Sequence, residues 1–142
     1  MQRDLSSQIK LARAIAPVAA VTDNTPFVSQ IVDVQGFDSL TCVGLVGSLA
    51  DADVVLTFLM EEGDDSGLSD AAAVADADLI GTELGMAPLF SDDNKTFKIG
   101  YKGSKRYCRL TITPSGNTGN IFLSALWIKG HPRTLPQSTQ VV

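Results

Sequence analysis

Residues 96–113 read TFKIGYKGSKRYCRLTIT, and apolar and polar side chains alternate along both halves of this stretch. In an extended chain, alternate side chains point to the same face. Phe97, Ile99 and Tyr101 therefore share one face of the first half, opposite Lys98 and Lys102. In the second half, Cys108, Leu110 and Ile112 share a face. This period of two residues is typical of half-buried strands, which we expect over 96–102 and 106–113.

The two runs are separated by Gly103, Ser104 and Lys105, which have the length and composition of a hairpin loop. We therefore expect the two strands to pair with each other in antiparallel fashion. The alternation also predicts which side chains are buried. The expected core residues are Phe97, Ile99, Cys108, Leu110 and Ile112, and the expected outward-facing residues are Lys98 and Arg109.

Further strands are expected on both sides of this pair. The main candidates are residues 27–34, 40–46, 54–61 and 121–129, with weaker ones at 79–84 and 17–21. Turn-forming residues rich in Asp, Asn, Gly and Pro separate them. With 142 residues, the chain has the length of one domain. We predict an all-β fold, a jelly-roll-like two-sheet β-sandwich of about eight strands with an N-terminal arm.

Two of the expected strands are apolar on both faces, namely Val54–Met60 and Ile121–Ile128. Such strands are either central to a sandwich or covered on their outer side by a partner chain. The periodicity does not distinguish between these two possibilities.

The first sixteen residues fit two secondary structures. Leu5, Ile9, Ala12 and Ala16 would share one face of a helix, whereas Ile9, Leu11, Arg13 and Ile15 alternate as in a strand. Pro17 ends either element. We expect residues 1–16 to form an arm that is ordered by packing on another subunit, residues 17–133 to form the sandwich domain, and residues 134–142 to form a C-terminal tail.

Residues with catalytic or metal-binding chemistry are scarce. His131 is the only histidine, and Cys42 and Cys108 form no Cys-x-x-Cys pattern. Acidic turns could supply oxygen ligands for calcium, but no EF-hand pattern is present and solvated turn residues explain them better. We expect no enzyme activity, no catalytic or metal-binding residues and no cofactor.

Charge is strongly segregated along the chain, which has sixteen acidic residues, eleven Lys and Arg residues and a net charge of −5. Residues 51–93 contain twelve acidic residues and no Lys or Arg, whereas residues 95–109 contain six Lys and Arg residues and no acid. Either the acidic loops fold back over the basic segment within one subunit, or a basic face meets an acidic face of another protein or copy.

The overall charge argues against nucleic acid as partner. Charges within the first twenty residues argue against a membrane span or a secretion signal, so we expect a cytoplasmic site of synthesis.

Four segments carry a resemblance to a known family. They are Asp4-Leu5 with Ile9-Lys10 and Ala14–Pro17, then Gln35-Gly36-Phe37-Asp38-Ser39, then the run from Gly100 to Leu110, and finally Gly130-His131-Pro132-Arg133. In these segments the chain resembles a family of small proteins of tailed bacteriophages and prophages, similar to capsid cement or decoration proteins built as a small jelly roll. The resemblance spans nearly the whole chain.

The resemblance implies a structural virion protein that binds the outer surface of the major capsid protein shell and stabilises it, after assembly in the host cytoplasm. The implied partners are the capsid protein and further copies of the chain, as a dimer or trimer. We expect contacts through the arm and the basic segment, at Leu5, Ile9, Arg13, Ile15, Lys98, Lys102, Lys105, Arg106 and Arg109. The alternatives are a carbohydrate- or receptor-binding module of a phage tail or fibre, and a hydrolase that uses the acidic loops.

Overall fold

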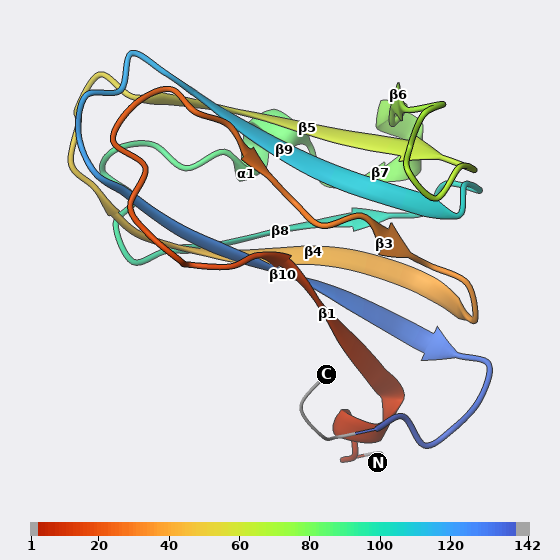
Figure 1. Cartoon of the computed structure of the whole chain (residues 1–142). Helices are drawn as coiled ribbons and strands as arrows, with labels where there is room; N and C mark the ends of the chain where they lie inside the picture. Colours follow the sequence, from red (N-terminus) through yellow and green to blue (C-terminus); the bar gives the residue numbers. More distant parts are fainter. Residues whose placement is uncertain (1–2, 139–142) are drawn as a thin grey trace.

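The structure is a computed structural model that describes residues 3–138, and it consists of two antiparallel sheets packed face to face (Figure 1). Sheet A has the strand order β1 (Ile9–Ile15), β10 (Ile121–Pro132), β4 (Phe37–Leu49), β8 (Thr96–Tyr101) and β7 (Leu79–Ile80). Sheet B has the order β2 (Phe27–Val28), β9 (Tyr107–Ser115), β5 (Val55–Gly63) and β6 (Ala72–Ala73), and β3 (Val32–Asp33) also pairs with β9. The helical elements are single turns, η1 (Ser6–Gln8), η2 (Asp76–Asp78) and α1 (Glu83–Met86).

The order of the strands is that of a jelly roll. When β2 and β3 are taken as one interrupted strand and β7 as an addition at the edge, eight strands remain. The first of them, β1, pairs with the last, β10, and β4 lies between β10 and β8. In the other sheet, β9 lies between β2/β3 and β5. This arrangement is the double Greek key of a jelly roll, so the predicted fold class is confirmed.

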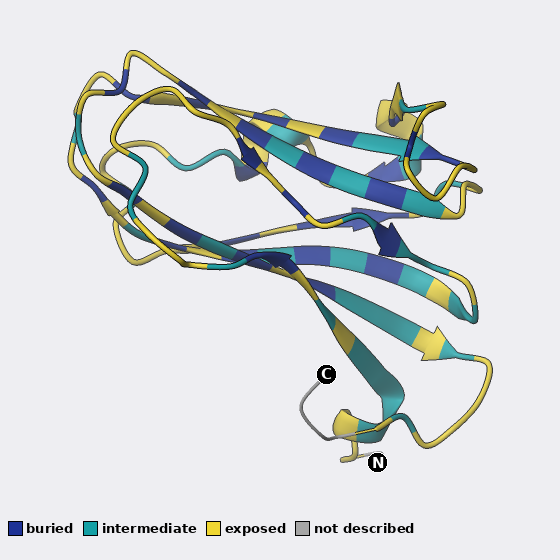
Figure 2. Ribbon diagram, in the orientation of Figure 1, coloured by how far each residue is buried: buried dark blue, intermediate teal, exposed yellow. Residues whose placement is uncertain are grey.

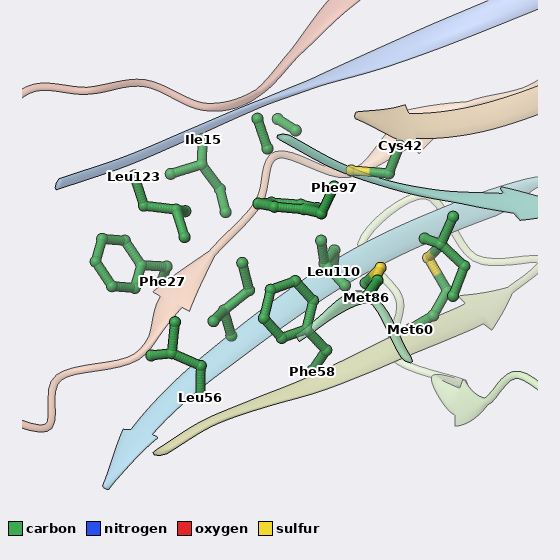
Figure 3. Close-up of a cluster of buried hydrophobic side chains, with 14 of the residues drawn as sticks. Ile15, Phe27, Cys42, Leu56, Phe58, Met60, Met86, Phe97, Leu110 and Leu123 are labelled. Atoms are coloured by element: carbon green, nitrogen blue, oxygen red, sulfur yellow. The ribbon is translucent and has the colours of Figure 1, made fainter. Parts of the chain in front are cut away.

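The core lies between the two sheets and is built from alternate residues of each strand, which appear as buried bands in Figure 2. Phe58 of β5 and Phe97 of β8 meet edge to face across it, with ring centroids 5.1 Å apart, and Figure 3 shows both rings in the apolar cluster. Trp127 is fully buried, and its indole N–H donates to the carbonyl of Gln30 over 3.1 Å. The five predicted core residues, Phe97, Ile99, Cys108, Leu110 and Ile112, are all buried.

The predicted hairpin between residues 96–102 and 106–113 is wrong. β8 lies in sheet A and β9 in sheet B, so residues 102–106 cross from one sheet to the other. A three-residue loop would have placed residue 99 opposite residue 109, and paired residues share a face of the sheet. Ile99 and Leu110 would then have pointed to opposite faces, whereas the crossing directs both into one core.

The crossing loop is held by Tyr101, the last residue of β8. Its hydroxyl donates to the carboxylate of Glu62 on β5 and accepts the backbone N–H of Lys105 over 2.9 Å. One side chain therefore connects sheet A, sheet B and the loop between them.

The N-terminal segment is a strand, and its expected position outside the sandwich is wrong. β1 forms one edge of sheet A by pairing with β10 (Figure 1), and Ala14 and Ile15 are buried in the core. A bulge between Arg13 and Ile15 turns Ile15 inward. The arm fits at this edge because its apolar residues alternate in register with those of the neighbouring strand β10. Of the expected C-terminal tail, residues 139–142 lie outside the described residues.

Candidate interaction surface

The outward side of sheet A is rich in apolar side chains. Along β10, Leu123, Ala125 and Trp127 point into the core, so Leu126 and Ile128 point outward. The neighbouring strands add outward-facing apolar residues of their own. We define the outer apolar face of sheet A by Ile9 and Leu11 of β1, Phe122, Leu126 and Ile128 of β10, and Val43 and Leu45 of β4.

Four residues of the outer apolar face, Leu11, Leu45, Phe122 and Leu126, are 41–48% exposed although they lie within regular strands. A hollow of about 700 Å³ runs over β4, β8 and β10 and is lined by Leu45, Leu126 and Lys98 among others. Contiguous exposed apolar side chains of this kind mark binding surfaces. The outer side of sheet B differs, because threonines of β5 and β9 alternate there with Val28, Val55 and Leu59.

Two basic residues frame the outer apolar face. Cross-strand pairing aligns Arg13 of β1 with Leu126, Leu126 with Val43, and Val43 with Lys98 of β8. Arg13 and Lys98 are both exposed, and neither forms an ion pair within residues 3–138. The row therefore presents a cation, two apolar side chains and a second cation to solvent.

Three of the other four predicted cations are paired within the chain, whereas Lys102 forms no ion pair within residues 3–138. Lys105 forms an ion pair with Asp64 at 2.5 Å. Two guanidinium nitrogens of Arg106 donate to the Asp33 carboxylate, at 2.8 and 3.0 Å. Arg109 donates to the Glu61 carboxylate at 2.8 Å. The hydrogen bond from Arg106 lowers the pKa of Asp33, and that from Lys105 to Asp64 raises the pKa of Lys105. For Lys105 and Arg109, the structure therefore shows the first of the two expected explanations, in which the acidic segment folds back over the basic one.

The predicted contact residues thus fall into three groups. Leu5, Ile9, Arg13 and Lys98 lie on or beside the outer apolar face, where Leu5 and Ile9 line a second hollow of about 350 Å³. Lys102, Lys105, Arg106 and Arg109 lie on the crossing loop and β9, and Ile15 is buried in the core. Sequence reasoning did not single out Leu11, Val43, Leu45 and Leu126, which also lie on this face. The available signal was the strand 121–128, which is apolar on both faces.

The acidic loops are organised by their own backbone. The Asp70 carboxylate accepts the N–H groups of Asp64 and Asp65 at 2.8 and 3.1 Å, and these bonds lower the pKa of Asp70. Asp65 in turn accepts the N–H groups of Gly67 and Ser69. Within residues 3–138, no group of three or more His, Cys, Asp or Glu side chains is placed to hold a metal ion.

The histidine is exposed on the surface, whereas the two cysteines are buried. His131 shares a hydrogen bond with the Ser39 hydroxyl at 2.9 Å on the surface. Cys42 and Cys108 are buried free thiols, and burial raises the pKa of each to about 12. A thiol in this state is a core residue and a poor nucleophile. In the described part of the chain, no helix has the length and apolar character needed to cross a bilayer.

Comparison with known proteins yields likenesses of fold. No protein family and no curated protein matches the sequence. Among solved structures, the PBSX exported protein XepA is 15% identical with a TM-score of 0.48, and the match covers 100% of this chain and 42% of XepA. The xylan-binding CBM22-1 domain of Xyn10C from Paenibacillus barcinonensis is 11% identical with a TM-score of 0.45, covering 90% of this chain and 83% of the domain. The CBM32 domain of AlyQ is 14% identical with a TM-score of 0.37, covering 92% and 98%. The chain thus spans less than half of XepA, and it is similar in fold to this exported protein and to carbohydrate-binding modules.

Proposed function

We propose that this protein is a capsid decoration protein of a tailed bacteriophage, which attaches to the outer surface of the major capsid protein shell through the outer apolar face of sheet A. The observation that carries the proposal is the row from Arg13 through Leu126 and Val43 to Lys98. It combines exposed apolar area with two cations that have no ion-pair partner in residues 3–138.

A decoration protein needs a rigid face and no reactive centre. Five of the seven side chains of the outer apolar face stand on β10 and β4, each of which is paired on both sides. Their positions are therefore set before binding, which lowers the entropic cost of forming an interface. Burying the exposed half of one leucine side chain contributes about 1 kcal/mol.

The nature of the partner comes from the sequence resemblance to phage decoration proteins. A capsid shell offers joints between subunits, and a protein that binds only the assembled shell stabilises it by mass action. The two free cations also favour a partner surface that carries acidic groups.

The alternative is a carbohydrate- or receptor-binding module of a phage tail or fibre. Modules that grip sugars use exposed aromatic rings for stacking. Among the described residues, Phe122 is the single aromatic side chain on the outer apolar face, and it lies at one end of β10. A surface of leucine, isoleucine and valine suits another protein better.

The test compares leucines of similar exposure on opposite sheets. The double variant Leu45→Thr/Leu126→Thr should bind expanded shells of the parent phage about 30-fold more weakly, since about 2 kcal/mol of burial is lost. Threonine keeps the strand propensity, so the melting temperature should change little. The control Leu59→Thr, on the outer side of sheet B, should bind like the parent protein.

Cosedimentation with shells measures how tightly each variant binds, and electron microscopy of the particles locates the protein. Equal binding by the double variant, or a location inside the shell or on the tail, would show that the assignment is wrong.

A further inference from the structure

The edge of sheet A formed by β1 is open over most of its length. β10 is the only strand that pairs with β1 in the described chain, and it occupies one side (Figure 1). On the other side, the Ser7 carbonyl accepts the N–H of Gln137 and the Ala14 carbonyl accepts the N–H of Gln30, each at 2.9 Å. Between these two bonds, residues 9–13 form no backbone hydrogen bond in the described chain other than those to β10.

The other terminal strands of the sandwich are much shorter than β1, which has seven residues. Sheet A ends on its other side with the two-residue β7, which pairs with Gly100 and Tyr101 of β8, and sheet B ends with the two-residue β6, which pairs with Glu61 and Glu62 of β5, and with β2 and β3, which are two residues each. A strand edge presents N–H and C=O groups that another extended backbone can pair with, and proteins usually avoid leaving a long edge free. β1 is the longest terminal strand among the described residues, and it offers a further strand a template at the end of a sheet.

The charges on β1 select the kind of strand. Lys10 pairs with Lys129 on the inner side of the sheet, whereas Arg13 pairs with Leu126 on the outer side. Lys129 already donates to the Asp33 carbonyl at 3.2 Å, but Lys10 has no ion-pair partner in residues 3–138. Residues 5–22 contain no acid. A second copy of β1 would bring the same two cations and be repelled, whereas a strand with acidic residues would neutralise both.

We infer that β1 receives an extended acidic segment of the capsid protein, which adds to sheet A as a further strand. This inference rests on the proposed function and specifies how the contact is made. The added strand would lie beside Leu11 and Ile9, so its outward side chains would extend the outer apolar face. Backbone pairing gives such a contact affinity, and the cations give it register.

Hydrogen exchange on the free and shell-bound protein tests the inference. In the free protein, the amides of residues 9–13 that do not bond to β10 should exchange rapidly. On shells of the parent phage, the same amides should slow by about tenfold or more, because a bound strand protects them. Binding without this protection overturns the inference and leaves the proposed function standing, whereas absence of binding overturns both. Protection that grows with protein concentration without shells would show that a second copy occupies the edge, and would also overturn it.

The charge requirement has its own matched variants. Lys10 lies away from the outer apolar face, so Lys10→Glu tests the edge without altering that face. It should weaken shell binding by about tenfold, while Lys10→Arg binds like the parent protein. The melting temperatures of both variants, measured in parallel, show that each is folded. Tight binding by Lys10→Glu would contradict an acidic strand at this edge.

Discussion

Arg13 and Lys98 close the two ends of one cross-strand row on sheet A, with Leu126 and Val43 between them. Three strand spacings of about 4.8 Å place their Cα atoms about 14 Å apart. Lys105, Arg106 and Arg109 are bound to carboxylates of the same chain, whereas these two cations are free to meet carboxylates of a partner.

The double variant Arg13→Glu/Lys98→Glu should therefore bind shells about tenfold or more weakly at low salt, and its binding should depend less on salt than that of the parent protein. Its stability should be nearly unchanged, because exposed charges contribute little. Lys102→Glu is the control, since Lys102 is exposed on the crossing loop. Cosedimentation at low and high salt provides the measurement. An equal loss of binding by Lys102→Glu would point to the net charge of the protein and not to the row.

Tyr101→Phe should destabilise the protein by about 1–3 kcal/mol, since it removes the group that joins Glu62 to the Lys105 backbone. Burial and the Glu62 hydrogen bond raise the pKa of Tyr101 above its usual value. A raised pKa contributes stability that is full below about pH 10 and is lost as the pH rises further. Parent and variant should therefore converge in stability above about pH 10, as measured by urea unfolding.

Tyr107→Phe is the control for this prediction. Tyr107 is half-buried on the outer side of sheet B, where the Arg106 guanidinium lies 5.0 Å from its ring centroid. Its loss should cost under about 1 kcal/mol. A similar cost for both variants would show that the Tyr101 hydroxyl does not hold the two sheets together.

The local pattern was sufficient to predict the longer strands, because burial on one face imposes a period of two on any sandwich. It failed for the candidate at 17–21, where only Val21 forms an isolated bridge, and for the two-residue β6. It did not predict the partner of each strand. Ile99 and Leu110 both point into one core. Which strands they pair with is determined by the long-range pairing of β8 with β4 and of β9 with β5. The short loop between them is compatible with a hairpin and with a crossing.

The candidate surface was partly predictable for a related reason. Charge segregation indicated Lys105 and Arg109, but a sequence does not show that Asp64 and Glu61 will fold next to them. The apolar character of 121–128 on both faces was the better signal. The sequence alone did not locate the resulting surface, because that surface depends on β1 and β4 lying on either side of β10.

Ile112→Ala should cost about 2–5 kcal/mol, because Ile112 is fully buried between Phe58 and Phe27 of the neighbouring strands. Truncation leaves a cavity that the rigid sandwich fills only in part. Thr113→Ala, the next residue on the exposed side of β9, should cost under about 1 kcal/mol. Urea unfolding of both variants measures the difference, and equal costs would contradict the predicted packing of β9.

Asp33→Asn should make the protein less sensitive to acid. The bidentate contact from Arg106 lowers the pKa of Asp33, and a lowered pKa contributes stability that is full above about pH 4 and is lost as the pH falls further. At neutral pH the variant should be less stable than the parent by under about 1 kcal/mol, since the pair is half-exposed. Once the pH falls below the lowered pKa of Asp33, the two should be nearly equal, because the parent carboxylate is then protonated as well. Asp53→Asn serves as the control, because Asp53 forms no ion pair within residues 3–138. If Asp33→Asn and the parent protein lost stability in parallel on acidification, the contact with Arg106 would not contribute to folding.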